Sequence, residues 1–227
     1  FDPTVGPLVD LWKTAGREQR MPVADEVAAA RKLVGWERVR VSNDEPPRLS
    51  LEDGARIDLG GVAKGRAADA GLEVLQVHGI DRALVELGGD LALCDRSEDP
   101  RPFTIGIRHP LGGGRLLGRL QIADGGVVTS GSAERFVEID GERYGHIVDP
   151  RTGYPVAGVL SATVMAPTSV EADAAATALM VLGPEAGLEL VAADPDLEAV
   201  LAVIDPSAPE GFRVEASAGA APLFSSP

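Results

Sequence analysis

Short apolar runs separated by glycine pairs and Asp-Gly steps occupy the middle of this chain, and they limit the possible fold more than any other feature. Such breaks occur at Gly88-Gly89, at Asp124-Gly125-Gly126 and at Asp140-Gly141. Because glycine reaches positive φ without steric cost, an Asp-Gly step between two apolar runs is typical of a β-hairpin. A chain with 27 glycines and 17 prolines is also a poor candidate for a helical bundle. The pattern predicts many short strands joined by tight turns.

The expected strands are listed here by residue range: 38–41, 55–59, 84–87, 91–94, 103–107, several short runs between 116 and 144, 160–165 and 199–204. The expected helices begin near Pro7, cover 22–36, run from the Gly60-Gly61 pair to His78-Gly79, follow Thr168, and cover 184–193. The helix after Thr168 is the best defined, because Thr168 and Glu171 form a T-x-x-E capping box and Gly183-Pro184 ends it.

These elements predict an α+β fold with mixed or antiparallel sheets and packed helices. Residues 1–205 are expected to form one domain, since no convincing linker interrupts them. Residues 206–227 are rich in Ala, Gly, Ser and Pro, so we expect a flexible tail with little to pack.

The charge of the chain limits its partners. Lys and Arg number 21 against 35 Asp and Glu, which gives a net charge of −14. Nucleic-acid binding depends on neutralising phosphates, so a nucleic-acid partner is not expected. An anionic ligand would need a metal ion or a local cationic pocket. The single cysteine, Cys94, excludes an intramolecular disulfide, and no stretch is apolar enough to span a bilayer.

The first candidate site is the segment Asp58-Leu59-Gly60-Gly61-Val62-Ala63-Lys64-Gly65. It is expected to lie between a strand and a helix, where glycines let a ligand approach and the first helical N–H groups favour an anion. Lys64 would add a positive charge, whereas the Asp58 carboxylate needs a bridging cation or a ligand hydrogen-bond donor. A tight turn with a surface lysine explains the same residues about as well.

The second candidate site is Asp173 with Thr177, four residues apart and therefore on one face of the capped helix. A carboxylate and a hydroxyl, completed by backbone carbonyls, waters and phosphate oxygens, suit magnesium. An exposed aspartate favoured by the helix dipole is the alternative from these residues alone.

The third candidate site combines hydroxyl-bearing Thr129 and Ser130, followed by Glu134 and Arg135, with the loop around His146. Hydroxyl groups can hold phosphate or ribose, and a histidine can bind a ligand or exchange a proton. The sequence from Asp149 to Gly153 is also an ordinary turn sequence.

Taken together, these segments resemble the ApbE family of FAD:protein FMN transferases. Six pieces occur in the family's order: Phe1 to Leu8, Asp58 to Gly65, Leu87-Gly88-Gly89-Asp90, Thr129-Ser130-Gly131, His146-Ile147-Val148-Asp149-Pro150, and Ala172-Asp173 through Leu179. Any one piece is weak, but six in order are specific and cover residues 1–190. The resemblance implies an ApbE-like architecture related to the T-fold.

The resemblance also implies roles for individual residues. Magnesium ligands would be Asp173, Thr177 and the backbone carbonyl of Gly61. Contacts to FAD are expected from Phe1, Asp2, Asp58, Lys64, Thr129, Ser130 and Val148. Asp173 and His146 would be catalytic, with His146 as the candidate base that takes the proton of an acceptor hydroxyl.

The implied reaction transfers FMN from FAD to a Thr or Ser of a target protein, with magnesium bound and AMP released. Two alternatives use the same residues: FAD pyrophosphatase activity, with water as the acceptor, and flavin binding without catalysis. Family members usually carry a longer stretch before the Phe1-Asp2 segment, so the N-terminal part of the family domain is expected to be missing here. An extracytoplasmic location, with membrane association through that missing part, is expected, although a cytoplasmic one stays open.

Overall fold

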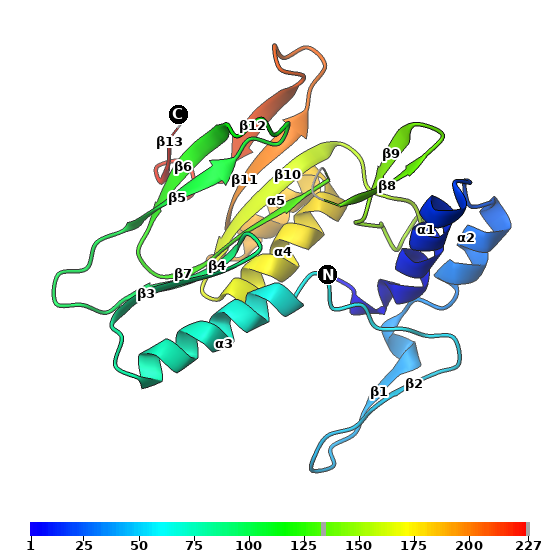
Figure 1. Cartoon of the computed structure of the whole chain (residues 1–227), viewed down its shortest axis with the longest axis horizontal. Coiled ribbons are helices and arrows are strands. Elements are labelled where there is room, and N and C mark those ends of the chain that lie inside the picture. The colour runs from blue at the N-terminus through cyan, green and yellow to red at the C-terminus, as the bar shows by residue number, and fades with distance from the viewer. Residues whose placement is uncertain (133–134, 226–227) are drawn as a thin grey trace. The chain divides into compact units, whose positions relative to one another are not determined.

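The computed structural model describes residues 1–132 and 135–225, which form two compact units. The first unit contains Phe1–Leu59 together with residues 135–156, and the second contains residues 60–132 and 157–225. The chain therefore passes through each unit twice, as the colours of Figure 1 show. Within the described residues, no helix has both the length and the apolar composition that a membrane crossing needs.

The first unit combines helices with two small hairpins. Its elements are the 3₁₀ helix η1 (Pro3–Val5), α1 (Gly6–Glu18), α2 (Ala24–Arg31), the 3₁₀ helix η2 (Trp36–Arg38), and the antiparallel pairs β1 (Val39–Val41) with β2 (Leu49–Leu51) and β8 (Phe136–Ile139) with β9 (Glu142–Gly145). Leu8, Trp12 and Ala15 of α1 pack with Ile139 and Val148 in its core. The Trp12 indole N–H donates to the Gly153 carbonyl at 2.8 Å, which ties α1 to the loop after β9.

The second unit is built on a fully antiparallel sheet of six strands. In spatial order they are β12 (Phe212–Ala216), β11 (Glu198–Ile204), β10 (Val159–Ala166), β7 (Gly125–Gly131), β4 (Asp90–Asp95) and β3 (Arg82–Leu87). A second sheet contains β13 (Phe224–Ser225), β6 (Leu116–Ile122) and β5 (Phe103–Arg108). Three helices complete the unit: α3 (Ala63–Val77), α4 (Ser169–Leu182) and α5 (Pro184–Ala193).

The six-stranded sheet is covered on both faces. On one face an apolar core joins it to β5 and β6, and that core includes Leu93, Val127 and Val200 of the large sheet. On the other face α3 contacts β3 and β4, α4 contacts β7 and β10, and α5 contacts β11, which Figure 1 shows as one layer of helices. A Cβ at Gly126 would lie 2.4 Å from the Ser169 Cα, so a glycine lets α4 begin directly against β7. Residues of β7 therefore alternate between an apolar core and a helix-covered face.

The α+β class and most predicted elements are confirmed. The helix expected at 184–193 is α5, the strand expected at 160–165 is β10, and the helix after Thr168 is α4. The Thr168 hydroxyl accepts from the Glu171 N–H at 3.3 Å, as the capping sequence predicts.

The strand predicted at 55–59 is wrong. The structure has no strand there, and the Asp58 N–H instead donates to the Pro3 carbonyl at 2.7 Å. A single backbone hydrogen bond to the start of the chain takes the place of the hydrogen-bond ladder of a strand. Residues 55–59 are therefore an irregular connection into α3. The helix predicted at 22–36 is also shorter, because α2 ends at Arg31.

The prediction that residues 206–227 have little to pack is wrong for their described part, 206–225. This segment contains β12, which pairs with β11, and β13, which pairs with β6. Phe212 is buried in the core between the two sheets, and Ala220 is also buried there. The prediction gave weight to the many small residues of this segment and overlooked Phe212, which becomes buried when β12 pairs at the edge of the sheet. That residues 1–205 form one domain stays a prediction.

If β12 is part of the folded core, Phe212→Ala should lower the free energy of unfolding by about 3 kcal/mol, because it removes a buried aromatic side chain. Val214→Ala, on the same strand but 40% exposed, is the matched control and should cost less than about 1 kcal/mol. Urea denaturation of the two variants measures both values. Equal losses in the two variants would contradict the placement of Phe212 in the core.

Candidate functional site

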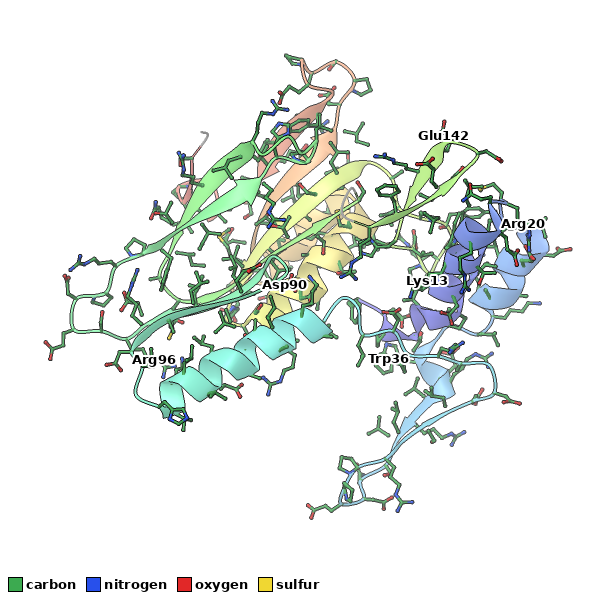
Figure 2. The ribbon with its side chains drawn as sticks, in the orientation of Figure 1. Lys13, Arg20, Trp36, Asp90, Arg96 and Glu142 are labelled. Atoms are coloured by element: carbon green, nitrogen blue, oxygen red, sulfur yellow. The ribbon has the colours of Figure 1, made fainter. Side chains whose placement is uncertain are left out.

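Two buried carboxylates, Asp90 and Asp173, mark the most unusual polar site in the second unit. Asp90 is the first residue of β4, pairs with Val128 of β7 and has no solvent exposure. Asp173 lies one turn into α4 and is 2% exposed. Figure 2 labels Asp90 at the start of its strand. A buried charge is costly unless it is paired, so the partners of these two groups decide what the site can do.

Lys64 provides the positive charge. Its ammonium lies 2.5 Å from Asp90 Oδ1, and its side chain is one third exposed. The other oxygen, Asp90 Oδ2, is buried, and among the described residues the one group that can donate to Asp90 from its far side is the Asp173 carboxyl when it is protonated. One acceptor of a buried carboxylate is therefore left for a further donor or a cation.

Asp173 is held by the backbone of α3 and affected by the charges around it. Its Oδ2 accepts from the Gly65 N–H at 3.2 Å. Burial, then the negative charge of Asp90, and also the hydrogen bond that the protonated group makes with Asp90 raise the pKa of Asp173 to about 6, although the Gly65 hydrogen bond and the Lys64 charge act in the opposite direction. The site therefore holds a carboxyl group whose ionisation is unfavourable at mildly acidic pH.

Thr177 lies one turn after Asp173 on α4, and its hydroxyl is 3.4 Å from the hydroxyl of Ser130 on β7. Thr129, the neighbour of Ser130, behaves differently. Its hydroxyl is 2.8 Å from that of Thr163, directly opposite on β10. Because adjacent strand residues point to opposite faces, Ser130 faces α4 and Thr129 faces away from it. Of the two predicted hydroxyls, the structure brings only Ser130 to the helix-covered face.

Gly61, the third predicted metal ligand, lies in the turn that leads into α3, three residues before Lys64. Gly61, Asp173 and Thr177 are thus all in the second unit, as are Lys64, Thr129 and Ser130. The structure joins Lys64 to Asp90, Asp173 to α3, and Thr177 to Ser130.

The other predicted residues lie in the first unit. The Asp2 carboxylate accepts from the backbone N–H of Thr4 at 2.9 Å and from its hydroxyl at 2.6 Å, so it caps the first turn. Phe1 is 41% exposed, whereas the Val148 side chain is buried in the core, which leaves its backbone for ligand contact. His146 is exposed, and its Nδ1 lies 3.0 Å from the Arg135 carbonyl. A carbonyl can only accept, so Nδ1 carries the hydrogen and Nε2 is the nitrogen that can take a proton.

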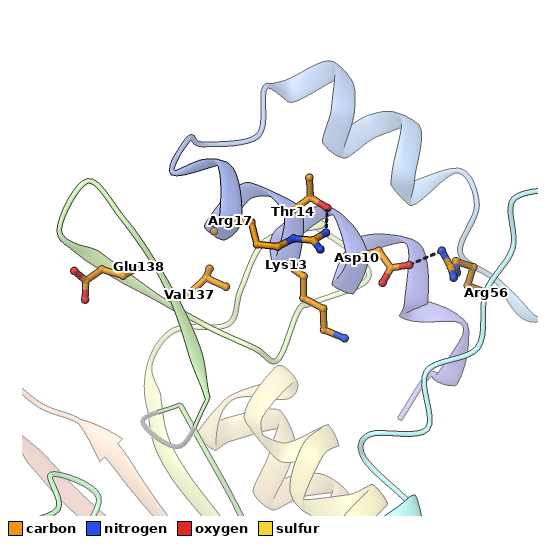
Figure 3. A pocket seen from close by; sticks show the side chains of 8 residues that line it. Asp10, Lys13, Thr14, Arg17, Arg56, Val137 and Glu138 are labelled. Carbon is orange, nitrogen blue, oxygen red and sulfur yellow. Dashed lines mark hydrogen bonds and ion pairs between the residues drawn. The ribbon is translucent and has the colours of Figure 1, made fainter.

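Asp58 is close to an open depression of about 620 Å³ in the first unit. Lys13 lines this depression and lies 3.9 Å from the Asp58 carboxylate. Figure 3 shows the other polar residues of its wall, including Arg17 bonded to Thr14 and Arg56 paired with Asp10. Its cations are thus mostly engaged by neighbouring side chains.

The sequence prediction did not include Asp90 among the candidate site residues, although the motif that ends in it was noted. The sequence did offer a signal: Asp90 stands between the Gly88-Gly89 pair and an apolar run, so a charged residue begins a strand that is expected to be buried. Asp69, which bonds α4 from α3, also escaped prediction, because an aspartate in an Ala-rich helix has no distinctive pattern. Glu134 lies outside the described residues.

Oxygen donors dominate the second-unit site. In the part of the chain that the structure describes, no three His, Cys, Asp or Glu side chains gather as a metal site. Two carboxylates with a hydroxyl nearby fit a hard cation that takes its remaining ligands from waters and a substrate. The ammonium of Lys64 and the start of α3 favour an anion at the same place. A cation bound together with a phosphate-bearing ligand satisfies both features.

Comparisons with known proteins agree with the resemblance. A sequence profile of the ApbE family matches residues 1–201. FAD:protein FMN transferase of Treponema pallidum is 38% identical, and the match covers 96% of this chain and 63% of that protein. The enzyme of the same name from Escherichia coli K12 is 36% identical over 84% of this chain and 56% of its own length. The chain thus spans less than two thirds of the length of these relatives.

Solved structures show the same fold. The ApbE protein of Thermotoga maritima is 33% identical, with a TM-score of 0.85 over 98% of this chain and 71% of that one. The apo form of the flavinyl transferase ApbE of Pseudomonas stutzeri is also 33% identical, with a TM-score of 0.81 over 99% of this chain and 69% of that one.

The raised pKa of Asp173 predicts a specific pH dependence of stability. The folded protein holds a proton on Asp173 up to about pH 6, whereas the unfolded chain releases it near pH 3.8. The contribution of this one group to the free energy of unfolding is therefore complete below pH 3.8 and is lost as the pH rises through 6. Asp173→Asn keeps an acceptor for the Gly65 N–H but cannot ionise. In metal-free buffer its stability advantage over the wild type should grow from near zero at pH 3.5 to roughly 3 kcal/mol at pH 7.

Urea denaturation across this pH range measures the difference. Glu189→Gln, an exposed change on α5, is the control and should show no comparable trend. A stability difference between Asp173→Asn and the wild type that stays flat from pH 4 to pH 7 would refute the perturbed carboxyl.

Proposed function

The chain belongs to the ApbE family, and from that premise we propose that it is a magnesium-dependent FAD:protein FMN transferase. It would cut the pyrophosphate of FAD, attach FMN through a phosphoester to a Thr or Ser of an acceptor protein, and release AMP. The observation that carries this proposal is the pair of buried carboxylates, Asp90 and Asp173, beside the partly exposed ammonium of Lys64, because one ammonium does not balance two carboxylates.

The donor set fits magnesium. Asp173 and Thr177 are spaced one turn apart on one helix face, and their donors are oxygens. We add Asp90 to the predicted ligands Asp173, Thr177 and the Gly61 carbonyl as a carboxylate of the same site. Magnesium bound there would neutralise charge on the pyrophosphate oxygens and on the leaving AMP.

The chain's own residues would bind and orient the substrate. Lys64, at the start of α3, and the N–H groups of that first turn other than that of Gly65, which donates to Asp173, would contact phosphate oxygens. Ser130 offers a hydroxyl on the same sheet face as Asp90, since Asp90 pairs with Val128 and Ser130 is two residues farther along β7. Asp58 and the backbone of Val148 are proposed contacts to the rest of FAD.

In the proposed transfer, the acceptor hydroxyl oxygen bonds to the phosphorus of the FMN half as the phosphorus bond to the bridging oxygen of AMP breaks. The hydroxyl proton leaves at the same time. We propose His146 Nε2 as its acceptor, because the Arg135 carbonyl fixes the hydrogen on Nδ1.

The proposal is tested by incubating the protein with FAD, Mg²⁺ and a peptide that carries the acceptor Thr or Ser. We expect AMP and a peptide heavier by one FMN, measured by chromatography and mass spectrometry, and no reaction after chelation. Asp173→Asn should lower this turnover by about 100-fold or more, because it removes a carboxylate ligand while keeping the fold.

Glu189→Gln is again the control and should react like the wild type. Free FMN and AMP without a modified peptide would identify a pyrophosphatase, and FAD bound but unchanged would identify a flavin-binding module. Either result refutes the transfer. Wild-type turnover in Asp173→Asn would refute the metal assignment alone.

A further inference from the structure

The helix α4 carries Asp173 and Thr177, and its first turn is capped from a different helix. The N–H groups of the first three helical residues, 169–171, have no acceptor within the helix. Here the Ser169 N–H donates to Asp69 Oδ1 at 2.8 Å, and the Val170 N–H donates to Asp69 Oδ2 at 2.9 Å. The third, from Glu171, goes to the Thr168 hydroxyl. Two of the three donors are thus satisfied by one carboxylate of α3.

A second contact joins the same two helices one turn away. Gly65 precedes Asp69 by four residues and therefore lies on the same face of α3. Its N–H donates to Asp173, which follows Ser169 by four residues on α4. Residue 69 meets the start of α4 and residue 65 meets its next turn, so the helices pack antiparallel, with one fixed register.

The register depends on a very close approach of the helices. A Cβ on Gly65 would lie 2.4 Å from the carbonyl oxygen of Ser169, so any other residue would force α3 and α4 apart. Ala68, on the same face, is fully buried. Because so little side-chain volume lies between α3 and α4, interlocking side chains offer little resistance to one helix sliding along the other. Directional hydrogen bonds must therefore hold the two helices in register.

We propose that Asp69 is a positioning residue for the site on α4. Its two hydrogen bonds set the register of α4 on α3, and that register places the Asp173 carboxylate at the Gly65 N–H, next to the Lys64–Asp90 pair. Asp69 touches no substrate or metal in this role. The expected effect of Asp69 on metal affinity rests on the proposed function, whereas its expected effect on the register of the two helices does not.

The Gly65 amide reports the register directly. Gly65 is the third residue of α3, so its N–H has no acceptor within the helix and its protection comes from Asp173. Asp69→Asn leaves one acceptor oxygen for two N–H donors. In metal-free, FAD-free protein we expect amide exchange at Gly65 to accelerate at least about 10-fold, as measured by NMR.

Two controls separate register from helix stability and from charge. Thr168→Ala removes the cap that α4 supplies to itself, and should accelerate exchange at Glu171 but not at Gly65. Glu73→Gln removes one negative charge from the exposed side of α3, where Glu73 pairs with Arg66, and should change neither amide. Asp69→Glu keeps both acceptor oxygens, and its Gly65 exchange should fall between those of the wild type and Asp69→Asn.

The second readout is the Mg²⁺ concentration that gives half of the metal-induced rise in melting temperature. We expect it to increase about 10-fold in Asp69→Asn and to change less than twofold in Thr168→Ala and Glu73→Gln. Faster Gly65 exchange in Asp69→Asn, with no Mg²⁺ response in the wild type, would support the register and refute the metal site. Gly65 exchange in both Asp69 variants no faster than in Thr168→Ala would overturn the positioning role.

Discussion

A carboxylate without solvent exposure is costly in a folded protein unless a partner compensates its lost hydration, and for Asp90 that partner is Lys64. The pair joins the first strand residue after the Gly88-Gly89 turn to the first turn of α3. It also sets the potential at Asp173, because the Asp90 charge raises the pKa of Asp173 while the Lys64 charge lowers it. The other polar features of the site are arranged around this one interaction.

The architecture explains why such a group can be buried at all. The large sheet has one face given to an apolar core and the other to helices, so polar residues that must be shielded from water can lie under the helices without interrupting that core. Val127 and Val128 show the division on one strand, since Val127 belongs to the core between the sheets while Val128 pairs with Asp90. Glycines at 65 and 126 allow α3 and β7 to approach the start of α4 closely. The site is thus supported by a sheet and two helices rather than by mobile loops.

The sequence predicted those parts of the fold whose signals are local. The helix after Thr168 was identifiable because a cap, an apolar body and a Gly-Pro stop occur in order, and α5 begins at a proline that suits a first turn. The segment 55–59 was misassigned because an apolar pattern does not show whether a neighbouring strand exists to pair with it. Phe212 was missed because the neighbouring small residues resemble a tail, and only the tertiary structure shows the sheet edge that buries it.

The candidate site was predictable in part for the same reason. Asp173 and Thr177 share a helix face, which follows from their spacing alone. That Asp90 lies near Asp173 depends on strand order, and that Asp69 caps α4 depends on helix packing, so neither follows from local pattern. Thr129 and Ser130 are adjacent in sequence, yet a strand sends their side chains to opposite faces. Alternation along a strand predicts this difference in direction from the sequence alone.

Burial of two carboxylates near a single ammonium leaves an excess of negative charge that the fold itself does not balance. The raised pKa of Asp173 shows the cost, since the protein favours a proton there over an ionised group. Natural proteins retain such locally unfavourable arrangements mainly where function requires them. A cation held by oxygen donors would remove the cost without any rearrangement of the pair. Under the proposed function, the same excess charge that weakens the metal-free fold would favour a cation at this site, while Lys64 and the start of α3 would favour an anion beside it.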